Sequence, residues 1–179
     1  MVAIMENFFE KSKEFFEKGD ITNTLEVFEK AIMHIDPNKE KSKTREYISF
    51  LEKILKYCKE SSLKEQEALV LRSLGRTHAI FKKHVESLKF HELSLKIQRE
   101  LGNKKDVAEG LVFLAEDLEI SGNYSECIKM FSDAADIFKE LGKLRKVKEI
   151  KKEISRLSNF SKEIVEDEYL LHKFNVDKF

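Results

Sequence analysis

Residues 68 to 147 read ALVLRSLGRTHAIFKKHVESLKFHELSLKIQRELGNKKDVAEGLVFLAEDLEISGNYSECIKMFSDAADIFKELGKLRKV and repeat with a period of 40. A fixed period of this length is typical of a solenoid, in which each unit buries its apolar face against its neighbours. The stretch therefore predicts a binding scaffold and not an enzyme, without naming the partner. The identical pairs that coincide without a gap are Ala68/Ala108, Leu71/Leu111, Leu74/Leu114, Ile80/Ile120, Glu86/Glu126, Lys89/Lys129, Ile97/Ile137, Glu100/Glu140, Leu101/Leu141, Gly102/Gly142 and Val107/Val147.

Apolar residues at helical spacing predict eight helices. Capping residues give the boundaries: Asp20 is expected to cap the second helix, and Gly102 is placed where a positive φ ends the fifth. Ser62-x-x-Glu65 and Asn123-x-x-Glu126 are expected to open the fourth and seventh helices. The expected ranges are about 2–18, 21–35, 39–59, 62–81, 85–101, 104–120, 123–141 and 143–157.

We expect a single domain over residues 1–179. It would comprise a first hairpin at 6–37, a long bridging helix at 38–62, clear repeats at 63–102 and 103–142, and C-terminal capping helices or a tail at 143–179. The tail beyond Ser161 is acidic and apolar, whereas 143–152 is basic. Because the ends of a solenoid need a cover, we expect the tail to fold back as a capping helix. The alternative is a tail that occupies a groove of its own or of a neighbouring molecule.

The two-helix units resemble the tetratricopeptide repeat (TPR). This resemblance implies an all-α, right-handed solenoid of antiparallel helix pairs, with eight or nine helices. The period of 40 exceeds the usual 34 or so, and so indicates the long-repeat type of the family. The motifs are Leu71-x-x-Leu74-Gly75-x-x-His78 with Ser87-x-x-x-His91, Leu111-x-x-Leu114-Ala115-x-x-Leu118 with Cys127-x-x-x-Phe131, and Phe8-x-x-Lys11-Ser12-x-x-Phe15 with Thr24-x-x-x-Phe28.

The resemblance also implies that the first helices of successive units line a concave groove for a peptide or a partner helix. The groove-facing positions would form a basic patch beside an acidic one. The two Arg residues lack the Asn partners of a carboxylate clamp, but they could still pair with acidic side chains of a ligand. Solvated surface charge is the alternative reading of these positions. They are Leu69, Arg72, Ser73, Arg76 and Ala79 in one unit, and Glu109, Val112, Phe113, Glu116 and Glu119 in the next.

The chain carries 33 basic and 33 acidic residues, so no overall charge attracts nucleic acid or an anionic membrane. The basic stretch 143–156 leaves a nucleic-acid-associated regulator as an alternative function. A third possibility is self-association, with a homodimer formed through residues 161–179. Our first expectation remains a non-catalytic adaptor that binds an unidentified protein or peptide and uses no cofactor.

Catalytic and metal-binding motifs are missing from the sequence: it has no phosphate loop, nucleophile elbow or His-Glu-x-x-His pair. His84 and His91 lie seven residues apart, but no further ligand completes a metal site. Cys58 and Cys127 are expected to be reduced core residues, which fits a cytoplasmic protein. The sequence shows neither a signal peptide nor a membrane span. The excess of Lys and Glu suggests a thermophilic source as a further hypothesis.

Overall fold

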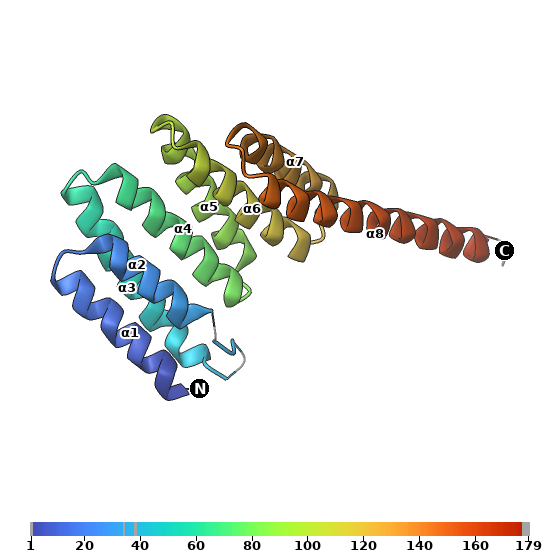
Figure 1. Cartoon of the computed structure of the whole chain (residues 1–179). Helices are drawn as coiled ribbons and strands as arrows, with labels where there is room; N and C mark the ends of the chain where they lie inside the picture. Colours follow the sequence, from blue (N-terminus) through green and yellow to red (C-terminus); the bar gives the residue numbers. More distant parts are fainter. Residues whose placement is uncertain (1, 34, 38, 177–179) are drawn as a thin grey trace.

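The structure is a computed structural model that describes residues 2–33, 35–37 and 39–176. Within these residues the chain is all-α, as the sequence predicts, and its eight helices follow one another as an array (Figure 1). Neighbouring helices make most of the contacts between elements, as expected for a solenoid. The helices are α1 (Val2–Glu17), α2 (Ile21–Ile32), α3 (Thr44–Glu60), α4 (Lys64–Ile80), α5 (His84–Glu100), α6 (Lys104–Ile120), α7 (Tyr124–Glu140) and α8 (Leu144–Val176), with a 3-10 turn at Lys41–Lys43.

The helices α3 to α7 are all 17 residues long, and three-residue turns separate them. One residue of each turn has a positive φ, so such residues recur every 20 positions. This conformation lets the chain leave the helix while its backbone N–H groups still bond to the last carbonyls. The five residues are Ser62, Lys82, Gly102, Gly122 and Gly142.

Three of the four predicted helix-end signals are confirmed. The side chain of Asp20 accepts a hydrogen bond from the backbone of Asn23, and that of Asn123 accepts one from Glu126. Gly102 has the expected positive φ. The capping box at Ser62 is wrong, because Ser62 is itself the left-handed turn residue and α4 begins after Leu63 without a side-chain cap.

Helix α3 follows the first hairpin in the chain, packs against α4 and is in register with the repeats. It begins 40 residues before α5 and 80 before α7. Its buried residues Tyr47, Leu51, Ile54 and Cys58 also recur as buried residues 40 and 80 positions later. The ring of Tyr47 packs edge-on against that of Phe9 at 4.5 Å between centroids, which joins α3 to the first hairpin.

Two apolar clusters fill the two halves of the array. The first extends from Phe9 to Leu74, and the second from Leu95 to Leu157. Helix α5 lies between them with mainly polar side chains at its buried positions, where α3 and α7 have mainly apolar ones. These side chains are Ser87, His91, Ser94 and Gln98, which we call the polar seam. Ser94, for example, donates a hydrogen bond to the carbonyl of Ala68 on α4 at 2.7 Å.

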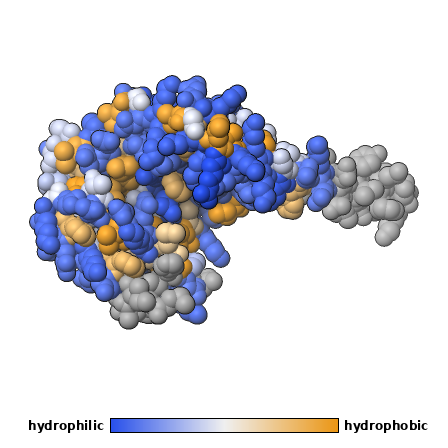
Figure 2. Space-filling view, viewed as in Figure 1, coloured by the Kyte–Doolittle hydropathy of each residue, from blue (hydrophilic) through white to orange (hydrophobic). Residues whose placement is uncertain are grey.

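Helix α8 continues without a break from Leu144 to Val176 and projects from the body of the array (Figures 1 and 2). The expected fold-back of the tail on the basic stretch is therefore wrong. No Gly or Pro follows Gly142, so α8 lacks the residues that most readily end a helix. Among the side chains of α8 that the structure describes, which end at Glu163, Leu157 is the last fully buried one.

Hydrophilic residues dominate the visible surface of the body, with apolar ones scattered among them (Figure 2). No helix in the described part of the chain is both long and apolar enough to cross a bilayer.

The turn geometry leads to a stability prediction. Lys82→Gly and Ser62→Gly should each raise the free energy of unfolding by about 1 kcal/mol, because glycine adopts a positive φ without the strain of a Cβ atom. Gly102→Ala should lower it by a similar amount. Urea unfolding followed by circular dichroism would measure all three. An unchanged or lower stability of Lys82→Gly would contradict the argument.

Candidate functional site

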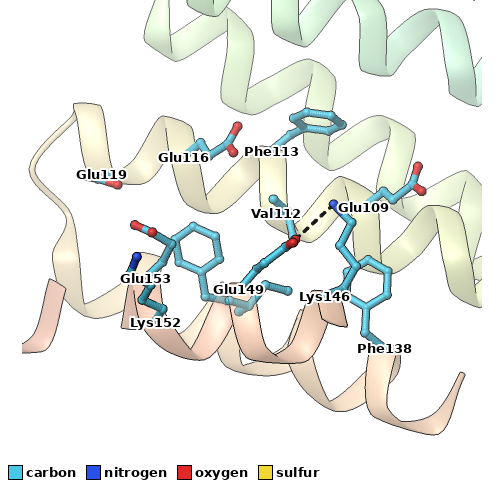
Figure 3. A pocket seen from close by; sticks show the side chains of 12 residues that line it. Glu109, Val112, Phe113, Glu116, Glu119, Phe138, Lys146, Glu149, Lys152 and Glu153 are labelled. Atoms are coloured by element: carbon cyan, nitrogen blue, oxygen red, sulfur yellow. Dashed lines mark ion pairs between the residues drawn. The ribbon is translucent and has the colours of Figure 1, made fainter. Parts of the chain in front are cut away.

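A groove opens between α6 and α8, with α7 beneath it (Figure 3). Its volume is about 620 Å³. We call it the α6–α8 groove. The residues that line it are Glu109, Val112, Phe113, Glu116 and Glu119 from α6, Phe131 and Phe138 from α7, and Lys146, Glu149, Ile150, Lys152 and Glu153 from α8.

The floor of the groove belongs to the C-terminal apolar cluster. Phe131, Phe138 and Ile150 are buried members of that cluster, and Val112 packs against it. Because these side chains are held by the core, the apolar surface that they present is formed before any ligand arrives. Such a surface with a few polar groups around it is typical of binding sites.

The rim of the groove is rich in carboxylates, and most of them are paired within the chain. The guanidinium of Arg156 contacts both carboxylate oxygens of Glu119, at 2.8 and 2.9 Å, and a carboxylate oxygen of Glu153 at 2.8 Å. Glu149 pairs with Lys146 at 3.7 Å (Figure 3), and Glu109 with Arg72 at 3.3 Å. These ion pairs set the positions of the rim side chains around the apolar floor.

Glu116 differs from the other rim carboxylates, since no ion pair to it is found among the described residues. Loss of hydration beside the groove walls raises its pKa above the usual range. The guanidinium of Arg76 acts in the opposite direction, whereas Asp117, Glu119 and Glu153 add to the rise. The groove therefore contains one carboxylate that forms no ion pair with the described residues.

The predicted basic patch is held by internal ion pairs. Arg76 contacts Glu29 of α2 at 2.7 Å and lies over the ring of Phe113 at 4.5 Å. Arg72 contacts Asp106 and Glu109 of α6 at 3.2 and 3.3 Å. These guanidiniums thus tie α4 to its neighbours on both sides.

The other predicted positions on α4 lie in varied surroundings. Ser73 is buried and donates a hydrogen bond to Glu29 at 3.3 Å, and Leu69 packs against the N-terminal apolar cluster. Ala79 lines a smaller pocket of about 240 Å³ together with Arg76. Phe113 and Glu116 line this smaller pocket as well as the α6–α8 groove, so the two hollows meet at these side chains.

A buried polar cluster lies behind the smaller pocket. The Ser87 hydroxyl donates a hydrogen bond to the carbonyl of Gly75 at 2.8 Å and contacts the carboxyl of Asp117. Nε2 of His91 lies 3.4 Å from the same carboxyl. Asp117 therefore stands between serine and histidine, an order that does not allow the imidazole to activate the hydroxyl. The cluster is better explained as part of the polar seam.

Burial perturbs both ionisable groups of this cluster. Desolvation lowers the pKa of His91 to about 4, and the positive charges of Arg76 and Arg72 add to the effect. Desolvation also raises the pKa of Asp117. His91 is confined as well: its ring lies so close to Gly75 that a Cβ atom there would be 2.7 Å from it.

No group of three or more potential metal ligands occurs in the described part of the chain. His91 is buried in the polar seam, and His34 and the side chain of His172 lie outside the described residues. Cys58 and Cys127 are buried free thiols, and burial raises the pKa of each to about 11. Both are therefore protonated and unreactive at neutral pH.

The residues from α7 and α8 that line the groove were not identified in the sequence. The period itself contains the missing signal, because Glu149 of α8 follows Glu109 of α6 by 40 residues. The stretch 143–152 is strongly basic, but it is also the beginning of the next first helix of the array.

Solved structures with the same arrangement of helices include TPR proteins. A Signal Transduction ATPase with Numerous Domains from Pyrococcus horikoshii, which has a tetratricopeptide repeat sensor, aligns with 82% of this chain at a TM-score of 0.56 and 18% identity. The chain has the fold of a TPR protein. The apo form of RapI aligns with 78% of the chain at a TM-score of 0.53 and 15% identity.

The chain spans only part of those proteins, 25% of the ATPase and 57% of RapI. No family model and no curated protein matches its sequence. At these identities the likeness concerns the fold alone, an array of helical repeats.

The buried imidazole makes stability depend on pH. Because the pKa of His91 is about 4 in the folded chain and ordinarily 6.5, the unfolded chain binds more protons between these values. The free energy of unfolding should therefore fall by about 2 kcal/mol from pH 7 to pH 5 through His91 alone. His78, whose pKa burial also lowers, adds to the fall.

His91→Leu tests this assignment, since Leu51 occupies the equivalent position of α3. Urea unfolding at pH 7, 6 and 5 should show a flatter dependence on pH for the variant. An equally steep dependence in both proteins would contradict the role of His91.

Proposed function

We propose that the protein is a non-catalytic adaptor that binds a peptide or a segment of another protein in the α6–α8 groove. The observation that supports this most directly is the apolar floor of Phe131, Phe138 and Ile150, open between two helices and bordered by charged side chains. Such a surface offers burial to an apolar anchor and hydrogen-bonding groups to its surroundings. The neighbouring TPR folds are consistent with this use.

The site proposed here lies further toward the C-terminus than the one expected from the sequence. It keeps Glu109, Phe113, Glu116 and Glu119 and adds the facing wall of α8. Arg72, Arg76 and Leu69 then act mainly in support, because the two guanidiniums are engaged in ion pairs and Leu69 packs on the N-terminal cluster.

Nucleic-acid binding by the stretch 143–156 is less well supported. Arg145 pairs with Glu149 at 3.1 Å, Lys146 contacts the same carboxylate, and Arg156 pairs with Glu119 and Glu153. Part of the positive charge is thus balanced within the chain. Salt dependence distinguishes the two functions, because binding to phosphates weakens steeply as salt is added.

A groove-filling variant tests the proposed function. Peptides would be selected from a displayed random library on the full chain, and their affinities measured by fluorescence anisotropy. Val112→Trp should weaken the selected peptides at least tenfold, because the indole fills space above the floor. Val85→Trp introduces the same side chain at a position that is 79% exposed on α5, and should leave affinity unchanged.

Equal binding to the wild type and to Val112→Trp would show that the groove is not the site. Failure to enrich any peptide would contradict peptide recognition. Binding of a labelled DNA duplex that falls steeply between 50 and 200 mM salt would instead support the nucleic-acid alternative. Circular dichroism of both Trp variants verifies that they are folded.

A further inference from the structure

The carboxylate of Glu116, which forms no ion pair with the described residues, indicates what kind of ligand the groove accepts. Glu116 lies where the α6–α8 groove and the smaller pocket meet. The other rim glutamates, Glu109, Glu119, Glu149 and Glu153, each contact a basic side chain of this chain. Glu116 has no such partner among the described residues and stands beside the partly exposed ring of Phe113 (Figure 3).

Two guanidiniums near Glu116 are already engaged. The guanidinium of Arg76 is bound to Glu29 at 2.7 Å and held over the face of Phe113. The guanidinium of Arg156 bridges Glu119 and Glu153. A rearrangement that supplied either of them to Glu116 would leave another carboxylate without its partner. Neither guanidinium is therefore available to Glu116 at low cost.

We infer that the groove selects a polypeptide segment in which a Lys or Arg side chain, bound by Glu116, lies next to an apolar side chain that enters the groove. This rests on the proposed function and adds the chemical class of the ligand. An ammonium or guanidinium would form a charge-assisted hydrogen bond with Glu116. Phe113 lies beside it, and the apolar floor of Phe131 and Phe138 would take the neighbouring anchor.

The course of α8 keeps the chain's own tail out of the groove, because the helix continues to Val176 and projects away from the body (Figure 1). The segment that follows Ser161 carries Glu163, Glu166, Asp167 and Glu168 within six residues. Placing these carboxylates beside Glu116 would bring like charges together. The ligand is therefore a separate, basic segment.

Two displayed libraries of equal length test the inference, one containing all amino acids and one without Lys and Arg. We expect groove-dependent binders, recognised by their loss of affinity for Val112→Trp, mainly from the complete library. Replacing the essential Arg of a binder by citrulline, or its Lys by norleucine, should weaken it about tenfold. Glu116→Gln should weaken the unmodified peptide similarly and the modified peptide at most twofold.

Glu52→Gln on α3 is the matched control, because it makes the same change in net charge at an exposed residue. It should leave affinity unchanged. Unfolding in urea should show that Glu116→Gln is at least as stable as the wild type, since it removes a negative charge close to Asp117, Glu119 and Glu153.

The possible outcomes separate the two proposals. Equally tight, Val112-dependent binders from the library without Lys and Arg would overturn the inference and leave the proposed function standing. Binders from both libraries that tolerate Val112→Trp would overturn the proposed function itself. Dimers of the chain in sedimentation that Glu116→Gln dissociates would identify a second copy as the occupant, and would contradict a separate ligand.

Discussion

The residue with a positive φ that recurs every 20 positions is the constraint on which the array depends. It ends each of five successive helices after 17 residues, so that all of them are equally long and equivalent side chains meet at every interface. Glycine meets this requirement at three turns, whereas Ser62 and Lys82 meet it with a strained backbone. That the geometry persists at these two positions shows that helix packing imposes it.

The polar seam of α5 separates the array into two cores with different roles. The N-terminal core packs aromatic rings of α1, α2 and α3 together. The C-terminal core provides the floor of the α6–α8 groove, and the ion pairs of Arg72 and Arg76 tie α4 to α6 and to α2. The floor of the groove is thus an exposed part of the C-terminal core, and most of the carboxylates around it are paired with basic side chains of the chain.

Sequence periodicity was enough to predict the fold class, the number of helices and most boundaries, because buried positions recur at a fixed spacing. The resemblance to the tetratricopeptide repeat also implied that Glu109, Phe113, Glu116 and Glu119 face a groove. It could not show that Arg72 and Arg76 pair internally, since ion pairs between helices depend on side-chain positions in three dimensions. The continuation of α8 into the tail was not predicted, although no Gly or Pro follows Gly142.

The common frame of 40 residues has a consequence for how such a chain can change in size. Residues 63–102 and 103–142 begin and end at equivalent points of equivalent turns. Duplication or loss of one such block would join a second helix to a first helix in the usual geometry, without a new type of junction. Evolution can therefore alter the number of blocks, and with it the reach of the scaffold, in whole steps that leave the remaining interfaces intact.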